Sequence, residues 1–349
     1  MIASYTRYNL KFIRPGGTSR GVLTEKETFF ITLRGEARWG IGECALFRGL
    51  SRDDRPGYEA KLQWVCRNIG LGWETLREEL GEWPSLLFGL EQAFRSLDSA
   101  SPMELFPSAF LQGRPIPING LIWMGAPSFM EQQIEAKLAE GYRCLKLKIG
   151  ALGFEQELEL LRSLRQRFSP GRLELRVDAN GAFRSAEALE KLHRLAEFGL
   201  HSIEQPIRAG QWDAMARLCR DSPLPVALDE ELIALGHSSD KRRLLQEVSP
   251  QFLILKPSLL GGYAACEEWI ALADDIGIGW WVTSALESNI GLNAIAQWTA
   301  TLQTEMPQGL GTGALFSNNF RSPLRTSGGQ LWYDAAPGWH LNKIQELCT

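Results

Sequence analysis

Side chains able to do acid–base or metal chemistry end a series of short apolar runs in the middle of the chain. In chain order they are Lys146, Lys148, Asp178, Glu204, Asp229 and Lys256. Three carboxylates gathered in one place would repel one another, and this repulsion would raise their pKa values. A hard divalent cation such as Mg²⁺ removes the problem because it prefers oxygen ligands. The pattern therefore predicts a magnesium site flanked by ammonium groups.

The spacing of these residues indicates how a fold would gather them. The steps are 30 residues from Lys148 to Asp178, 26 to Glu204, 25 to Asp229 and 27 to Lys256. Each step has the length of one β/α unit, so each residue falls at the same level of successive strands. In a barrel that level is the C-terminal mouth, where active sites of the fold lie. One such carboxylate alone is more typical of a helix N-cap; five residues in register predict an active site.

The strands and helices needed for a barrel follow from about Ile116 onward. Apolar runs alternate there with amphipathic helical segments, which is typical of a parallel sheet, and about seven repeats fit a closed barrel. No Gly-x-Gly-x-x-Gly segment follows a strand, which argues against an open dinucleotide-binding sheet. We therefore expect an α/β fold, a modified TIM (β/α) barrel, with the barrel over residues 113–310.

The first hundred or so residues have a different pattern. The runs 28–33 and 39–44 predict an antiparallel hairpin or meander, and apolar residues at helical intervals over 86–97 predict a helix. Strands followed by helices are typical of a small α+β domain, which we place at residues 1–112. The segment 14–21, rich in Gly and polar residues, is predicted to be a mobile loop.

Composition argues against several classes of function. With 37 Lys and Arg against 41 Asp and Glu, the net charge is −4, which argues against a nucleic-acid partner. The apolar runs are far shorter than the ~20 residues of a membrane span, and the N-terminus has no signal-peptide pattern. The six cysteines lie far apart with no zinc-ligand spacing. We expect a cytoplasmic protein with reduced thiols, no membrane partner and a small-molecule substrate; the oligomeric state stays open.

Five short motifs carry a resemblance to a known family. They are Lys-x-Lys at 146–148, Asp-x-Asn at 178–180, Glu-Gln-Pro at 204–206, Asp-Glu at 229–230 and Leu-Lys-Pro at 255–257. In this order and spacing the chain resembles the enolase superfamily, and its lysines resemble those of the muconate-lactonising subgroup. The resemblance implies an N-terminal α+β capping domain on the barrel, completed by a C-terminal segment, 311–349, that returns to the cap.

Within this subgroup, four segments are similar to the o-succinylbenzoate synthase family of menaquinone biosynthesis. They are 84–93, 117–121, 283–291 and 308–316. This resemblance implies a lyase that carries out the syn dehydration of 2-succinyl-6-hydroxy-2,4-cyclohexadiene-1-carboxylate to o-succinylbenzoate. Gln205 is a departure, because many members have a second Glu there. The implied metal ligand is Glu204, so the departure leaves chelation intact.

The resemblance also implies the metal site. Asp178, Glu204 and Asp229 would hold Mg²⁺, with Mn²⁺ as a substitute, and Asn180 and Glu230 would support them. The positive charge of the ion would then stabilise the enediolate that forms when the α-proton is removed.

The lysines would divide the proton chemistry between them. Lys148 would be the base that removes the proton α to the substrate carboxylate. Lys146 points to the same face of its strand, and its charge would lower the pKa of Lys148. Lys256 would lie on the other face of the substrate and stabilise the enediolate as a cation, partly by cation–π contact.

Further residues are candidates for contact with the substrate. Trp123 ends the first barrel strand and is the tryptophan expected to face a substrate. The others are Asn119, Ser284 and Glu287, which match the family pattern, and Thr18 and Arg20 of the segment 14–21, as contacts for the succinyl carboxylate.

Two other kinds of function remain open from sequence alone. An N-acylamino-acid racemase or a dipeptide epimerase uses the same two opposed lysines, and muconate cycloisomerase is a weaker alternative. A catalytically inactive barrel that only binds is the alternative outside enzymes. Inactive relatives usually lose a metal ligand or a lysine, and all of these residues are present here.

Overall fold

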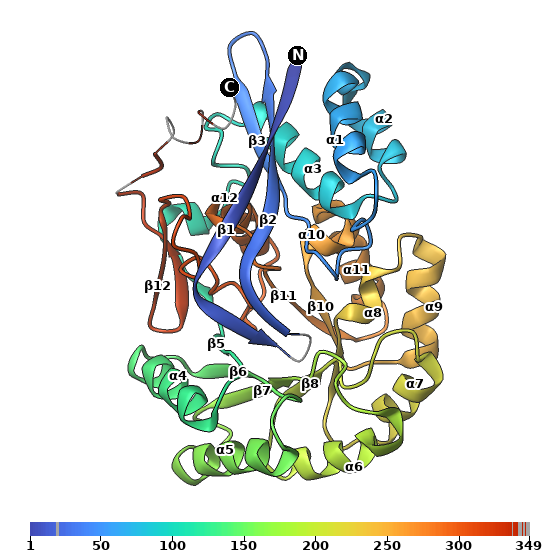
Figure 1. The fold of residues 1–349 in the computed structure, drawn as a ribbon, viewed down its shortest axis with the longest axis vertical. Coiled ribbons are helices and arrows are strands. Elements are labelled where there is room, and N and C mark those ends of the chain that lie inside the picture. Colours follow the sequence, from blue (N-terminus) through green and yellow to red (C-terminus); the bar gives the residue numbers. More distant parts are fainter. Residues whose placement is uncertain (19–20, 337, 341–343, 345, 347–349) are drawn as a thin grey trace.

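The structure, a computed structural model, describes residues 1–18, 21–336, 338–340, 344 and 346. Figure 1 shows an antiparallel sheet with helices lying over one end of a curved parallel sheet, which a row of helices surrounds. This is the expected α/β architecture, a modified (β/α) barrel with an N-terminal cap. Within the described residues, no helix has both the length and the apolar character needed to cross a membrane.

The cap begins with three strands in the order β1-β2-β3, all antiparallel. They are β1 (Ile2–Thr18), β2 (Gly21–Arg34) and β3 (Trp39–Cys44), followed by α1 (Tyr58–Arg67), η1 (Ile69–Leu71), α2 (Gly72–Glu79) and α3 (Pro84–Asp98). Helix α3 lies directly on β3: a Cβ on Gly42 would stand 1.8 Å from the carbonyl oxygen of Gly89. These two glycines allow the close contact between helix and strand.

The prediction of a mobile loop over 14–21 is wrong for residues 14–18, which continue strand β1. Gly16 and Gly17 pair with Leu23 and Val22 across the hairpin. A Cβ on Gly17 would stand 2.4 Å from the carbonyl oxygen of Met124 in the barrel. The glycines therefore serve a close approach between hairpin and barrel, which sequence alone does not distinguish from a flexible loop.

The barrel sheet has seven parallel strands among the described residues, in the order β11-β10-β9-β8-β7-β6-β5. In chain order they are β5 (Gly120–Ile122), β6 (Cys144–Lys148), β7 (Glu174–Asp178), β8 (Ser202–Glu204), β9 (Val226–Leu228), β10 (Phe252–Leu255) and β11 (Gly279–Val282). The predicted run 116–123 is divided between β5 and the short β4 (Ile116–Pro117).

A short segment closes the sheet where an eighth strand would stand. Gln308 forms a bridge to Ile118 on one side, and Gly309 forms one to Thr283 on the other. The backbone N–H of Asn119 donates to the carbonyl of Gln308 at 3.0 Å. We call this segment, 308–311, the seam of the barrel.

The longer helices cover the outside of the sheet. They are α4 (Pro127–Ala139), α5 (Phe154–Arg167), α6 (Ser185–Ala196), α7 (Trp212–Asp221), α9 (Ser238–Val248), α11 (Tyr263–Asp274) and α12 (Asn289–Thr301). Two short helices, α8 (Glu230–Ile233) and α10 (Pro257–Leu260), directly follow β9 and β10, and α10 packs against α3 of the cap; η2 (Ala109–Gln112) precedes β4.

Strand alternation separates the apolar and polar faces of the barrel. Leu145, Leu147, Val177 and Ile203 belong to the large core that the sheet forms with the helices. The residues between them, such as Lys146, therefore face the barrel interior, so each strand brings its final polar side chain to the inner mouth.

The C-terminal residues divide between the cap and the other end of the barrel. The carbonyl of Leu315 accepts a hydrogen bond from the backbone of Ile13, and Ser317 donates to the carbonyl of Lys11. Beyond this, β12 (Leu324–Ser327) and β13 (Gln330–Tyr333) form a hairpin that pairs with β4. The division at 1–112, 113–310 and 311–349 stays a prediction.

Candidate active site

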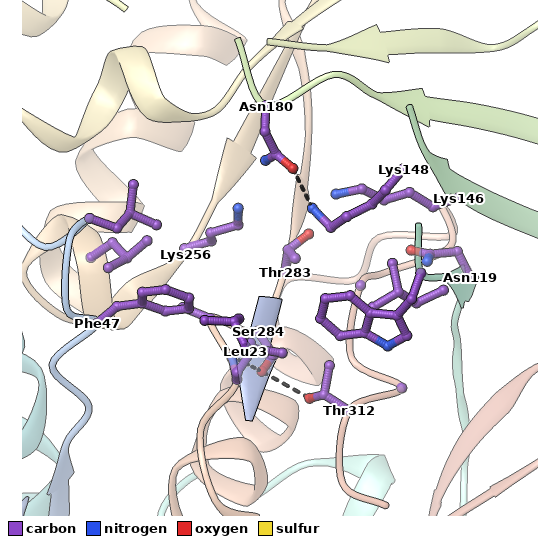
Figure 2. Close-up of a pocket in the computed structure, with 18 residues that line it drawn as sticks. Leu23, Phe47, Asn119, Lys146, Lys148, Asn180, Lys256, Thr283, Ser284 and Thr312 are labelled. Atoms are coloured by element: carbon purple, nitrogen blue, oxygen red, sulfur yellow. Dashed lines mark hydrogen bonds between the residues drawn. The ribbon is translucent and has the colours of Figure 1, made fainter. Parts of the chain in front are cut away.

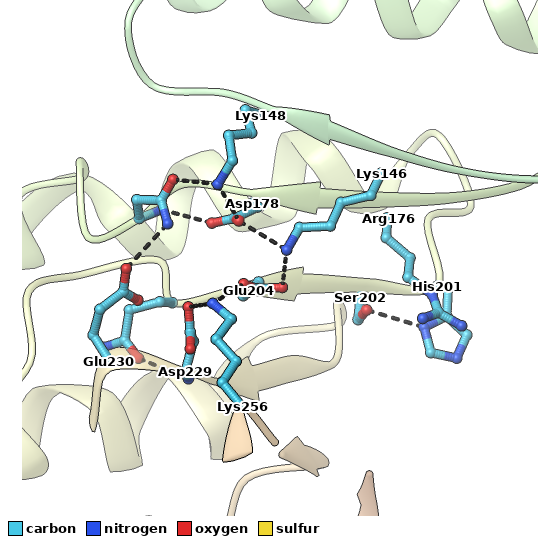
Figure 3. A network of polar contacts seen from close by, with 12 residues as sticks. Lys146, Lys148, Arg176, Asp178, His201, Ser202, Glu204, Asp229, Glu230 and Lys256 are labelled. Atoms are coloured by element: carbon cyan, nitrogen blue, oxygen red, sulfur yellow. Dashed lines mark hydrogen bonds and ion pairs between the residues drawn. The ribbon is translucent and has the colours of Figure 1, made fainter. Parts of the chain in front are cut away.

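The polar side chains predicted from spacing come together inside the barrel mouth. Lys148 is paired in register with Asp178, and Asp178 with Glu204, on β6, β7 and β8. Asp229 and Lys256 follow the ends of β9 and β10. Figure 3 shows these side chains joined in one network of hydrogen bonds and ion pairs.

Lys146 bridges two carboxylates. Its Nζ lies 2.6 Å from Oε2 of Glu204 and 2.9 Å from Oδ2 of Asp178. Burial by itself would lower the pKa of Lys146, but the charges of Asp178 and Glu204 outweigh it and hold the pKa above its ordinary value. Lys146 is therefore a permanent cation in this arrangement.

Lys148 has a different electrostatic setting. Its Nζ donates to Oδ2 of Asp178 and to Oδ1 of Asn180, both at 2.8 Å. Burial lowers the pKa of Lys148, and the charge of Lys146 acts in the same direction, while Asp178 opposes them. The lysine with the lowered pKa is the one predicted to act as the base.

Lys256 approaches the network from the opposite side. It donates to Asp229, and its Nζ lies 3.7 Å from Oε1 of Glu204. Burial opposes the charged form, but Asp229 and Glu204 raise the pKa of Lys256 above its ordinary value. Lys256 is therefore held as a cation.

Burial also affects the three carboxylates. It raises the pKa of Glu204 to about 7, with the charge of Asp178 acting in the same direction. For Asp178 the lysines outweigh burial and hold its pKa well below the ordinary value. For Asp229 burial prevails over Lys256 and raises the pKa. Three neighbouring carboxylates thus depend on positive charge to stay ionised.

The donor set fits a hard cation in its chemistry. Oε1 of Glu204 is buried and accepts no hydrogen bond, which leaves it available as a ligand. Among the described residues, however, no three acidic, His or Cys side chains are grouped closely enough to hold a metal ion. In this structure the ammonium groups of Lys146 and Lys256 lie between the carboxylates.

Asn180 joins the base to the neighbouring loop. Its Oδ1 accepts from Lys148, and its Nδ2 donates to Oε1 of Glu230 at 3.0 Å. Its backbone N–H donates to Oδ1 of Asp178, with φ at 45°. Asn tolerates this left-handed backbone conformation better than most residues. The turn keeps the side chains of Asp178 and Asn180 together at the site.

Gln205, noted in the sequence as a departure from the family, has a structural role that the sequence did not predict. Its Oε1 accepts from the backbone N–H groups of Asp229 and Glu231, at 3.1 and 3.3 Å. Its Nε2 donates to Oε2 of Glu231 at 3.2 Å. Gln205 thereby ties the end of β8 to the turn that carries Asp229. Its position directly after Glu204 was the only signal for it.

A pocket opens beside this network, between the barrel mouth and the cap. Figure 2 shows Lys148 and Lys256 reaching it from different sides. The lining also includes Asn119 and Trp123 from the region of β5, and Ser284 after β11, as predicted. Phe47, from the cap, and Thr312 line it too and were not predicted.

The remaining predicted contacts lie elsewhere. Glu287 does not line the pocket; it accepts a hydrogen bond from the Ser284 hydroxyl at 2.6 Å and supports it from behind. Thr18 is the last residue of β1, and its side chain lies outside the described residues, as does Arg20 altogether. Thr312 donates to Ser284 at 2.9 Å and completes this chain of hydroxyls.

Comparison with known proteins finds relatives that match most of the chain. A family model described as enolase C-terminal domain-like matches residues 130–342. The o-succinylbenzoate synthase of Desulfotalea psychrophila is 50% identical over 95% of this chain and 98% of that protein. An N-succinylamino acid racemase of Thermus thermophilus is 30% identical over 78% of this chain and 75% of that protein.

Solved structures agree with these relatives. The crystal structure of MenC from Desulfotalea psychrophila matches with a TM-score of 0.85 at 47% identity, covering 95% of this chain and 99% of that one. A dipeptide epimerase from Cytophaga hutchinsonii, complexed with Mg, matches at 0.80 with 20% identity over 95% and 93% of the two chains, which shows the shared fold. The chain therefore belongs to the enolase superfamily, in the group that includes the o-succinylbenzoate synthase of Desulfotalea psychrophila.

Proposed function

We propose that the chain is an o-succinylbenzoate synthase, a hydro-lyase that dehydrates 2-succinyl-6-hydroxy-2,4-cyclohexadiene-1-carboxylate in menaquinone biosynthesis. The observation that carries the proposal is the 50% identity to such a synthase over nearly the whole of both chains. The racemase of Thermus thermophilus is 30% identical over less of the chain, so racemisation is not favoured.

Lys148 is the proposed base. Its lowered pKa favours the neutral amine, and its Nζ is proposed to take the proton α to the ring carboxylate. Because the dehydration is syn, the proton and the hydroxyl leave from the same face of the ring. The ammonium formed on Lys148 therefore faces the departing hydroxyl and can return the proton as water forms.

Positive charge on the other side of the substrate stabilises the intermediate. Lys256, held as a cation, reaches the pocket from a different side than Lys148 and would attract the negative charge that proton removal creates. It need not exchange a proton in this reaction, which fits its raised pKa. A racemase would need Lys256 to deliver or take a proton instead.

Asp178, Glu204 and Asp229 are the proposed holders of Mg²⁺, with Mn²⁺ as a substitute. When bound, the ion supplies charge where the substrate carboxylate becomes more negative. Support comes from the orphan oxygen of Glu204 and from the Mg carried by the dipeptide epimerase of Cytophaga hutchinsonii. Asn180 and Glu230 are proposed to position the base and the loop beside it.

The cap is proposed to complete the pocket over the substrate and to exclude water. Phe47 and Leu23 reach the pocket from the cap. Asn119, Trp123 and Ser284 are the proposed substrate contacts from the barrel, with Glu287 behind Ser284. The partner is a small molecule, and a cytoplasmic location remains part of the proposal.

A spectroscopic assay of the purified chain tests the function. The hydroxy-cyclohexadiene carboxylate is supplied with Mg²⁺, then with EDTA, and the loss of diene absorbance is followed. We expect turnover that EDTA abolishes and that added Mg²⁺ restores. No turnover in a folded protein that binds Mg²⁺ would contradict the proposal. Exchange of the α-proton of N-succinylamino acids or dipeptides in D₂O would then favour the racemase or epimerase.

A further inference from the structure

A second cavity adjoins the active-site pocket on the seam side of the barrel. Its volume is about 290 Å³, and it lies between β5, α4 and the residues that follow the seam. Four residues line both this cavity and the active-site pocket: Asn119, Leu121, Trp123 and Gly311. We call it the seam cavity. Its wall is continuous with the wall that faces the proposed substrate.

The charges that line the seam cavity leave one cation in excess. Lys137 pairs with Glu140 at 2.7 Å and lies over the ring of Tyr142, 4.8 Å from its centre. The remaining charged residue of the lining is Arg14 of β1, which is exposed at the rim. Within the part of the chain that the structure describes, no carboxylate pairs with Arg14. Its guanidinium is therefore available to an anionic ligand in the cavity.

The shared wall carries a polar group without a protein partner. Asn119 is 4% exposed, and its buried Oδ1 makes no hydrogen bond among the described residues. The backbone N–H of Asn119 donates to the carbonyl of Gln308, which fixes the position of the Asn119 backbone between the two cavities. The Nδ2 group of the same amide is the part that can donate a hydrogen bond to a ligand carbonyl.

Gly311 lines both cavities and adds no side chain to the wall that they share. A Cβ there would stand 3.5 Å from the carbonyl oxygen of Asn119 and 3.8 Å from the hydroxyl of Tyr142. A longer side chain would project between these residues and narrow the seam cavity.

The geometry points to the seam cavity as the subsite for the succinyl chain, with Arg14 as the residue that binds its terminal carboxylate. This inference rests on the proposed function, whose substrate carries a second carboxylate at the end of a short keto chain. With the ring between Lys148 and Lys256, the chain passes Asn119, whose Nδ2 can donate a hydrogen bond to the ketone oxygen. Arg14 then meets the carboxylate, for which its planar fork of N–H donors is suited.

The test compares Arg14→Gln and Arg14→Lys with Lys11→Gln. Lys11 is an exposed cation of the same strand that lines neither cavity, so its variant controls for the loss of one charge. For Arg14→Gln we expect KM for the diene substrate to rise about tenfold, as for loss of one charged hydrogen-bond partner at an exposed site, with a smaller change in kcat. Arg14→Lys should recover part of the loss, and Lys11→Gln should leave both constants unchanged.

A second substrate identifies the group that Arg14 binds. With the terminal carboxylate converted to its methyl ester, wild type and Arg14→Gln should have the same KM. An unchanged KM for the natural substrate in Arg14→Gln, or an equal rise with the ester, would overturn the inference.

A binding measurement separates this inference from the proposed function. If the wild-type protein does not turn over the diene, the proposed function is rejected. The affinities for o-succinylbenzoate and for benzoate still test whether the seam cavity binds the succinyl chain. Arg14→Gln should weaken binding of o-succinylbenzoate about tenfold and leave that of benzoate unchanged. Equal affinities of wild type and variant for o-succinylbenzoate, or no binding by either, would reject the subsite.

Discussion

The carboxylate of Glu43, on cap strand β3, accepts a hydrogen bond from the backbone N–H of Ser288, which precedes barrel helix α12; the Oε1–N distance is 3.0 Å. The N–H of Gly291 donates to the other oxygen at 3.0 Å. A carboxylate at this end of a helix is stabilised by unpaired N–H groups and by the helix dipole. The N-cap of this helix is Ser288, and Glu43 of the capping domain accepts hydrogen bonds from further N–H groups beside it, which ties the two parts of the fold together.

We predict that Glu43→Ala destabilises the whole chain. The change leaves N–H groups of α12 without partners and removes a carboxylate whose charge favours the buried ammonium of Lys26. Leaving a buried hydrogen-bonding group without its partner costs about 1–3 kcal/mol. The urea midpoint measures the loss. Glu25→Ala, at an exposed site of the neighbouring strand, is the control. Equal midpoints for the two variants would contradict the prediction.

We predict that Lys148→Ala abolishes turnover and leaves Mg²⁺ binding intact. Loss of a general base lowers rates by about 10²–10⁴-fold, whereas the proposed metal ligands all remain. Steady-state kinetics and calorimetric titration with Mg²⁺ measure the two effects. Lys191→Ala, on the outer helix α6, removes a lysine far from the site and should retain the wild-type rate. A Lys148→Ala variant with normal activity would remove Lys148 as the base.

The pH profile of kcat/KM should have an acidic limb that is set by the pKa of Lys148. Only the neutral amine accepts a proton, so activity is lost as pH falls through the pKa of Lys148, which burial places below 10.5. The charge of Lys146 contributes to this lowering. Lys146→Met should therefore move the limb to higher pH, when measured at saturating Mg²⁺. The same limb in wild type and variant would show that Lys146 does not set the basicity of Lys148.

Gln205→Glu should destabilise the turn that carries Asp229. The amide of Gln205 donates to Glu231, so a carboxylate there would replace a hydrogen bond with a like-charge contact. We expect a loss of about 1–3 kcal/mol in the free energy of unfolding. Adding Glu231→Gln restores a donor facing the new carboxylate and should recover most of the loss. A double variant no more stable than Gln205→Glu would argue against this pairing.

The reacting side chains were predictable because they obey a local rule. Alternation along a strand places Lys146 and Lys148 on one face, and the length of a β/α unit repeats that placement at Asp178, Glu204 and Asp229. Both properties can be read from the chain without knowing what packs against it. The barrel and its mouth follow from the same rule, which is why the sequence also indicated the fold.

The residues that support the site could not be predicted, because their partners lie far away in the chain. Glu43 meets Ser288 across 245 residues, and Phe47 enters the pocket from the cap. The segment 14–18 was misjudged for the same reason. Its glycines are required by the close approach of Trp123 and Met124, which only the folded structure reveals.

Closure of the sheet by the seam has a consequence for how this barrel can diversify. Lys146, Asp178 and Glu204 stand on strands held by neighbours on both sides, so their placement tolerates little change. The wall at Gly311 belongs to irregular backbone, where insertions and exchanges are tolerated more readily. Related barrels can therefore gain new substrates through substitutions or insertions in the seam, while the lysines and carboxylates on the strands keep the same proton chemistry.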